Sequence, residues 1–201
     1  MIHSEYIRVN RILAALVFLI SFIVYFDTMA PTVSYWDCGE FIAVSHTLGV
    51  PHPPGSPFFL LLGRVASMLP INEDIAFRVN ILSPLSSAFA VMFLYLIIVQ
   101  VVTHWRGKLE SIMDALVAFG GGIVGSLAFA FSDSHWFNAV EAEVYAFSTF
   151  FTAIVVWLIL HWSEKADEKG HERYILIIAY MIGLATGLHL LNLLTLPFVA
   201  L

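Results

Sequence analysis

The fold of this chain is decided by the stretch VNILSPLSSAFAVMFLYLIIVQVV, which runs from Val79 to Val102 and contains no charged residue. It exceeds the roughly 20 apolar residues that a helix needs to cross the hydrocarbon core of a bilayer. Similar runs extend over residues 12–30, 112–131, 142–162 and 174–201. The sequence therefore predicts an all-α integral membrane protein, a multi-pass helical bundle of about five transmembrane helices.

The composition agrees with this class and excludes others. Of the 201 residues, 60% are hydrophobic and 12% are charged, and the mean hydropathy is +0.87. Soluble domains have about 45–50% apolar and about 25% charged residues. The net charge is -6 and no block of Lys or Arg is present, which excludes nucleic acid as a partner. Cys38 is the single cysteine, so no intrachain disulfide and no cysteine-based zinc site can form.

The basic residues predict the orientation. With five spans, seven of the nine Lys and Arg residues fall on one side of the membrane, at Arg8, Arg11, Arg106, Lys108, Lys165, Lys169 and Arg173. Cytoplasmic loops carry such an excess, so the N-terminus is predicted to be cytoplasmic. Residues 31–78 and 132–141 then face the periplasm or lumen, where many of the acids lie. The chain ends inside an apolar run, and we expect it to be the N-terminal part of a longer protein formed as a single module over residues 1–201.

The long outer loop is predicted to be structured. Apolar residues recur at helical spacing over 37–49, and Gly49-Val50-Pro51 supplies a stop. The proline-rich turn 51–57 follows, and residues 58–69 form a second apolar helix that is too short to span. Two interfacial helices are therefore expected between the first two spans.

Asp37 and Glu40 are the first candidate site residues. Three residues apart at the start of a helix, their carboxylates lie on one face, at the membrane boundary, where a charge is costly to keep. This favours a general base. The alternative is that Asp37 caps the helix and Glu40 completes a capping box.

A second acidic point lies at Asn138, Glu141 and Glu143, at the mouth of the fourth span. With Asp37, the two glutamates are candidate ligands of a divalent cation, Mg or Mn, although oxygen-ligand clusters have weak sequence signatures. The absence of any metal is the alternative.

Four basic or imidazole side chains remain. His52 lies in the proline turn, and His189 lies within the fifth span, where it is either functional or a packing residue bonded to Asn192. Arg64 and Arg78 are the outer cations, which either bind a phosphate or extend toward lipid headgroups.

Several motifs carry a resemblance to a known family. They are the runs Ser34 to Phe41 (SYWDCGEF), Gly49 to Pro57 (GVPHPPGSP), Phe137 to Tyr145 (FNAVEAEVY) and Gly187 to His189 (GLH). With the arrangement of spans and loops, they resemble the GT-C superfamily of membrane glycosyltransferases, and within it the protein O-mannosyltransferase-like branch. The resemblance covers essentially the whole chain.

The resemblance implies transfer of a sugar, expected to be mannose, from a polyprenyl-phosphate donor to a hydroxyl acceptor, expected to be a protein Ser or Thr, with inversion. Asp37 would be the base and Glu40 would orient it or the acceptor. His52, Arg64, Arg78, Asn138, Glu141, Glu143 and His189 would bind substrate. The setting implied is the outer face of a bacterial inner membrane, with the lipid bilayer as a further partner.

Two other function classes stay open. A transporter or channel would use the same acids along an ion path and predicts charged residues near the middle of the spans. A non-catalytic assembly subunit would tolerate replacement of Asp37 by Asn.

Overall fold

The computed structural model describes residues 3–107 and 111–197. These residues form helices joined by turns, with no strand among them. Lys108, one of the predicted cytoplasmic cations, lies outside the described residues.

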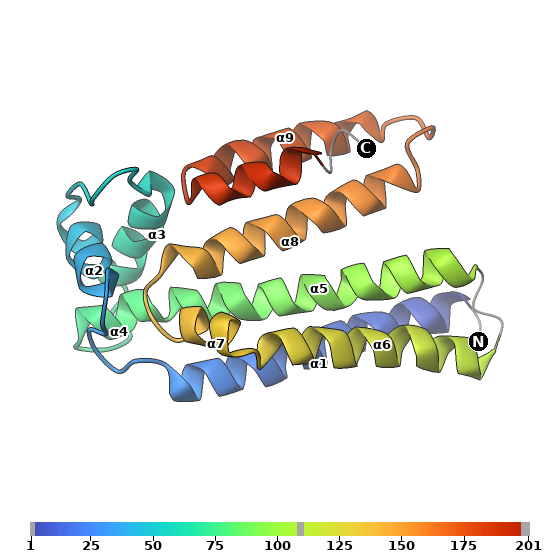
Figure 1. Ribbon diagram of the computed structural model, residues 1–201, viewed down its shortest axis with the longest axis horizontal. Helices are drawn as coiled ribbons and strands as arrows, with labels where there is room; N and C mark the ends of the chain where they lie inside the picture. Colours follow the sequence, from blue (N-terminus) through green and yellow to red (C-terminus); the bar gives the residue numbers. More distant parts are fainter. Residues whose placement is uncertain (1–2, 108–110, 198–201) are drawn as a thin grey trace.

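Four helices of the described chain are long and apolar enough to cross a membrane. They are α1 (His3–Thr28), α5 (Leu82–Arg106) continued from the short α4 (Ile75–Asn80), α6 (Ile112–Ala130) and α8 (Val144–Ser163). They lie side by side along the long axis of the molecule, with α5 in contact with α1, α6 and α8 (Figure 1). The prediction of an all-α, multi-pass integral membrane protein is confirmed.

Glycine sets the distance between α5 and α6. A Cβ atom added at Gly122 would lie 2.7 Å from Val99 Cγ2 and 2.9 Å from the ring of Tyr95. Small residues at such points allow helix backbones to approach closely, which is a common device in membrane helix packing.

The fifth predicted span, 174–201, is not one continuous helix. The helix α9 (Glu172–Thr186) ends at Thr186, inside the predicted span. The chain then turns back and forms the 3-10 helix η1 (Leu190–Thr195), which lies beside α9 and α8 (Figure 1). The turn is held by tertiary contacts: Phe58 N donates to the Gly187 carbonyl at 2.9 Å, and Asn192 Nδ2 donates to the Ala185 carbonyl at 3.0 Å. Hydropathy alone carries no sign of such a reversal. Residues 198–201 of the predicted span lie outside the described residues.

The two predicted interfacial helices are present as α2 (Cys38–Thr47) and α3 (Pro57–Met68), and they pack on each other at one end of the bundle (Figure 1). Asn80, fully buried, ties this end together, because its Nδ2 donates to the carbonyls of Ala30 at 2.8 Å and Thr32 at 2.9 Å. A further short helix, α7 (Asp133–Ala139), occupies the segment between α6 and α8.

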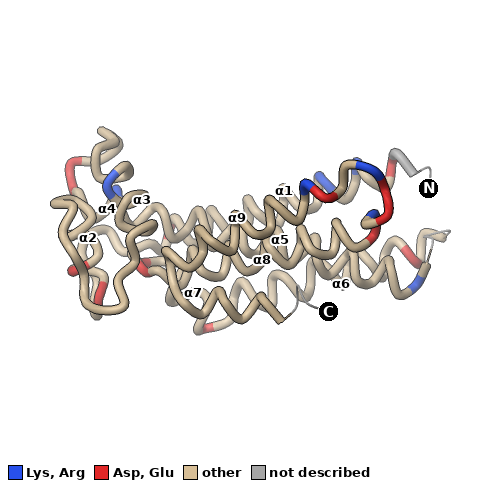
Figure 2. Tube along the Cα trace, turned by 90° about the horizontal axis from the view of Figure 1, so that it is seen from above, with Lys and Arg blue, Asp and Glu red and all other residues tan. Residues whose placement is uncertain are grey.

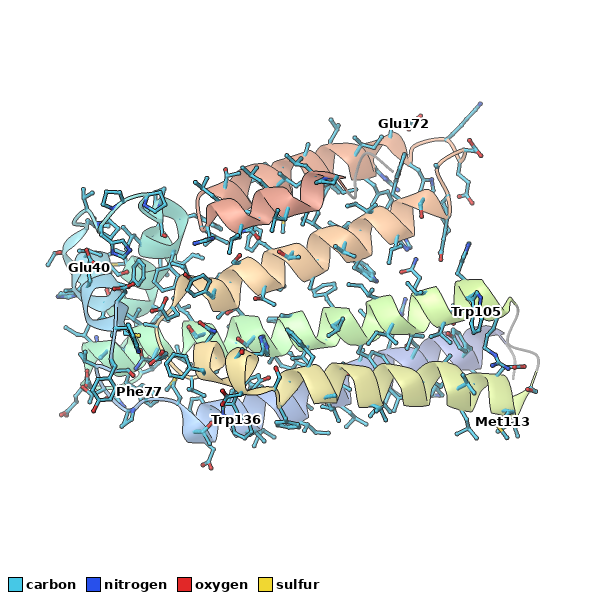
Figure 3. All side chains as sticks on the ribbon, viewed as in Figure 1. Glu40, Phe77, Trp105, Met113, Trp136 and Glu172 are labelled. Carbon is cyan, nitrogen blue, oxygen red and sulfur yellow. The ribbon has the colours of Figure 1, made fainter. Side chains whose placement is uncertain are left out.

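Charged residues gather at the two ends of the helices, and the middle of the bundle is almost free of them (Figure 2). Glu40 lies at the end that holds α2 and α3, whereas Trp105, Met113 and Glu172 lie at the opposite end (Figure 3). The candidate residues are therefore sought at the α2–α3 end.

Candidate functional site

Several segments that are distant in the sequence meet at the α2–α3 end of the bundle. The start of α2, the proline turn, the start of α8 and the turn after α9 enclose a small cavity of about 50 Å³. Its polar lining consists of Asp37, His52, Ser56, Glu143, Tyr145 and His189. We call this the end cavity.

Asp37 precedes the first residue of α2, but it does not cap the helix. Its side chain makes no capping hydrogen bond, and 58% of the side chain is exposed. The residue before it, Trp36, has a φ of 58°, in the left-handed region that non-glycine residues rarely occupy. The capping-box alternative is therefore wrong, and the carboxylate is free to meet a substrate.

Glu40 holds His52 by two hydrogen bonds. Its Oε1 accepts from the main-chain N of His52 at 2.8 Å, and its Oε2 lies 2.7 Å from the ring Nδ1. The other ring nitrogen, Nε2, lies 4.0 Å from Asp37 Oδ2. The hydrogen bond from His52 lowers the pKa of Glu40, and the bond to Glu40 raises the pKa of His52, with smaller contributions from the charges of Asp37 and Glu143. The cluster thus favours a charged imidazolium next to two carboxylates.

Glu141 and Glu143 are both buried just before α8. Ser34 Oγ donates to Glu141 Oε2 at 2.5 Å, and the Cys38 thiol donates to Glu143 Oε1 at 3.8 Å. Burial first, and then the charges of Asp37 and Glu141, raise the pKa of Glu143 to about 7. Burial and the two glutamates also raise the pKa of Cys38, so this thiol is no nucleophile at neutral pH.

The side chains that lie close enough together to hold a metal ion are not the same set as the predicted one. In the part of the chain that the structure describes, ligand atoms of Asp37, Glu40 and His52 all lie within 4.8 Å of one another. Glu141 and Glu143 are instead turned toward Ser34 and Cys38, although Glu141 Oε1 is a buried oxygen with no hydrogen-bond partner.

The structure does not bring Arg64, Arg78 or Asn138 to the end cavity. Arg64 donates to the His46 carbonyl. Arg78 donates to the carbonyls of Ser67 at 3.1 Å and Asn72 at 2.5 Å, and Asn138 donates to that of Ser134 at 2.7 Å. These side chains stabilise local backbone.

His189 joins the site because α9 ends at Thr186 rather than running on. Its ring lies 5.1 Å from that of Tyr145, and its Nδ1 accepts from Leu191 N at 3.2 Å. Asn192 bonds the backbone carbonyl of His189 and not the ring. Tyr145 and Ser56 also line the cavity although no sequence pattern marked them as site residues, and only their closeness to Glu143 and to the proline turn could have indicated them.

The fold and the site define a multi-pass membrane protein whose acids and imidazoles converge at one end of its helical bundle. Residues 37–201 match the family model described as protein O-mannosyl-transferase TMEM260 N-terminal domain. The chain belongs to this family.

Two curated relatives support the assignment. The protein O-mannosyl-transferase tmem260 of Dictyostelium discoideum is 32% identical over 198 residues, covering 91% of this chain and 22% of that protein. The protein O-mannosyl-transferase TMEM260 of Mus musculus is 30% identical over 149 residues, covering 74% of this chain and 19% of that protein. The chain therefore spans about a fifth of the length of these relatives. No solved structure matches it.

Proposed function

We propose that this chain forms the catalytic membrane module of a glycosyltransferase that moves mannose from a polyprenyl-phosphate donor to a Ser or Thr hydroxyl of a protein. The observation that carries the proposal is the exposed carboxylate of Asp37 at the mouth of the end cavity, in a family whose named relatives are protein O-mannosyl-transferases.

In the proposed reaction Asp37 accepts the proton of the acceptor hydroxyl. The hydroxyl oxygen attacks the anomeric carbon, the bond from that carbon to the phosphate oxygen breaks, and polyprenyl phosphate leaves with the bonding electrons. Attack from the face opposite the phosphate inverts the anomeric centre. An aligned base of this kind contributes about 10²- to 10⁴-fold to a rate.

The position of the site favours a lipid-linked donor. The end cavity is lined by the first residues of α8 and by residues of α2 and of the turn before α3, so it lies at the end of the bundle, where the headgroup of a membrane-embedded lipid could reach it. We propose that this end faces the lumen or periplasm, because most described Lys and Arg residues lie at the other end (Figure 2).

The lack of charged residues in the middle of the described spans disfavours a transporter or channel. The candidate spans carry their Asp, Glu, Lys and Arg residues near their ends, as in α6, where Asp114 lies in the first turn, and α5, where Arg106 is in the last. An ion path through the bundle would place such residues at mid-span.

A divalent cation at this site would be held by Asp37, Glu40 and His52, whose ligand atoms are close enough for one ion. It would supply positive charge to the phosphate that leaves. Carboxylate and imidazole donors suit Mn²⁺, which accepts nitrogen more readily than Mg²⁺ does.

The test is transfer of mannose from polyprenyl-phosphate-mannose to a Ser/Thr-rich peptide by the purified full-length protein. Asp37→Asn is expected to lower turnover by at least 100-fold, because the amide cannot accept the proton. Asp27→Asn is the matched control, an exposed aspartate in the last turns of α1 and outside the cavity. Equal turnover of native and Asp37→Asn protein would refute the role of Asp37 as the base. Loss of transfer in EDTA, with recovery on addition of Mn²⁺, would support a divalent cation at the site.

A further inference from the structure

A larger cavity lies between three of the membrane-spanning helices, at the end of the bundle away from Asp37. Its volume is about 560 Å³, which falls in the roughly 300–1,000 Å³ range of sites that hold small molecules. Its lining comes from the first turns of α1, the last turns of α5 and the end of α8. This is the end that carries Trp105 and Glu172 in Figure 3. We call it the α1–α5–α8 cavity.

Several polar side chains of this cavity have no partner in the described protein. Tyr6 and Thr103 line the cavity, but they bond each other at 3.0 Å. Arg11, Gln100 and Glu164 form no side-chain hydrogen bond and no ion pair with any residue that the structure describes. The cavity thus offers a cationic, an anionic and an amide side chain to a ligand.

Apolar side chains complete the wall, among them Leu96, Val99 and Trp157. The three helices are candidate membrane spans, and charged residues gather at their ends (Figure 2). The cavity therefore lies where the headgroups of a bilayer meet its acyl chains. A phospholipid that enters from the bilayer at this level carries a polar group and apolar chains, and so it meets both kinds of wall.

The charges of the cavity match a particular kind of headgroup. A guanidinium such as that of Arg11 binds phosphate through charge-assisted hydrogen bonds. A carboxylate such as that of Glu164 repels phosphate, but it accepts hydrogen bonds from a primary ammonium. A headgroup that carries a phosphate and a primary ammonium satisfies both side chains. A trimethylammonium group has no N–H to donate, and a glycerol headgroup has no positive charge.

We propose that the α1–α5–α8 cavity binds a zwitterionic phospholipid, with the phosphate at Arg11 and the primary ammonium at Glu164. The amide of Gln100 both donates and accepts, and it bonds the headgroup as well. Gln100 and Glu164 also line an adjoining cavity of about 370 Å³ on α5 and α8, which extends the space for acyl chains. Because the site lies at the end away from Asp37, binding of this lipid does not depend on the proposed function.

The experiment titrates the full-length protein, purified in detergent and stripped of lipid, with phosphatidylethanolamine, phosphatidylcholine and phosphatidylglycerol of the same acyl chains. Bound lipid is counted by native mass spectrometry, and the melting temperature is followed in parallel, since a ligand that binds the folded state raises it. The variants are Arg11→Gln and Glu164→Gln. The matched controls are Arg8→Gln in α1 and Glu172→Gln in α9, both at exposed positions outside the cavity.

We expect phosphatidylethanolamine to bind the native protein about fivefold more tightly than either other lipid, the effect of one charged contact at a membrane surface. Arg11→Gln should weaken binding of phosphatidylethanolamine and phosphatidylcholine alike, by about fivefold. Glu164→Gln should weaken binding of phosphatidylethanolamine alone, so that the difference between these two lipids disappears. Both control variants should bind as the native protein does.

Three results would overturn the site. The first is equal affinity of the native protein for the three lipids, or tighter binding of phosphatidylglycerol. The second is equal binding of phosphatidylethanolamine by the native protein and both cavity variants, as expected where another segment of the full-length protein fills the cavity. The third is a loss of binding in Arg8→Gln as large as that in Arg11→Gln, which would indicate a general effect of surface charge. Melting without lipid verifies that each variant is folded.

Discussion

Helix α3 lies close against Ser45 of α2 at Gly63, and this contact predicts a strong effect of a single added methyl group. A Cβ at this position would lie 2.4 Å from Ser45 Oγ and 2.8 Å from Ser45 Cβ. Real Cβ atoms essentially never lie under 3.0 Å from a non-bonded heavy atom of another part of the chain, so Ser45 or one of the helices must move. The hydroxyl can rotate away, but the Cβ of Ser45 moves only with the backbone of α2.

Gly63→Ala is therefore expected to cost about 1–3 kcal/mol of stability, the range for overpacking a well-filled contact. For a chain of this size, each kcal/mol lowers the melting temperature by roughly 2–4 °C. Because α2 starts next to Asp37 and carries Glu40, mannose transfer should fall as well. The assay is thermal unfolding of the full-length protein in detergent, followed by turnover at a temperature at which both proteins are folded.

Two further variants make the result specific. Gly121→Ala adds the same methyl group to α6, where nothing lies within 4 Å, and should be neutral or slightly stabilising. Ser45→Gly combined with Gly63→Ala removes both clashing atoms and should recover part of the loss. If the Gly63→Ala and Gly121→Ala proteins have the same melting temperature, the packing argument is refuted.

Three other outcomes follow from the same structure. Between about pH 4.5 and 7 the folded state holds the Glu143 proton more tightly than the unfolded chain does, so the free energy of unfolding should fall as pH rises through this window. Glu143→Gln should make the melting temperature less dependent on pH in this range. Parallel plots of melting temperature against pH for the native and variant proteins would contradict this. Asn80→Ala should cost about 1–3 kcal/mol by removing the two hydrogen bonds to the carbonyls of Ala30 and Thr32, measured by thermal unfolding. Arg78→Ala should lower the melting temperature with no change in the KM for the donor, because the guanidinium bonds backbone carbonyls. A large rise in this KM would instead support the prediction that Arg78 binds phosphate.

Local sequence signals were enough to predict where α2 and α3 begin and end. Gly49-Val50-Pro51 ends the first of these helices, and the proline-rich turn fixes where the second begins. Both predicted ranges agree with the structure to within about two residues at each end, which is ordinary for helix boundaries. The stretch from Val79 to Val102 also lies within one membrane-crossing unit, which begins slightly earlier, at Ile75.

Contacts between distant segments were not predictable in the same way. The apolar run after Tyr174 has no local signal for its break, because the turn at Gly187 depends on a hydrogen bond from Phe58 in another helix. The sequence therefore predicts His189 inside a span, whereas the residue lines the end cavity.

The same limit applies to charged side chains. Spacing along a helix predicts that Asp37 and Glu40 share a face, but it cannot reveal that Glu40 bonds His52, twelve residues further on in the proline turn. Nor can it reveal that Arg78 is bound by carbonyls of the preceding loop. The residue types of the site were visible in the sequence, whereas their partners required the fold.

The end cavity is assembled from segments that each continue from a different helix of the bundle. Helices in a bilayer tilt when the hydrocarbon layer becomes thinner or thicker than their apolar length. Tilt of α8, one of the candidate spans, would carry Glu143 and Tyr145 sideways relative to Asp37. If the proposed function holds, we expect turnover to depend on the acyl-chain length of the surrounding lipid, through the spacing of these groups and without any lipid entering the cavity.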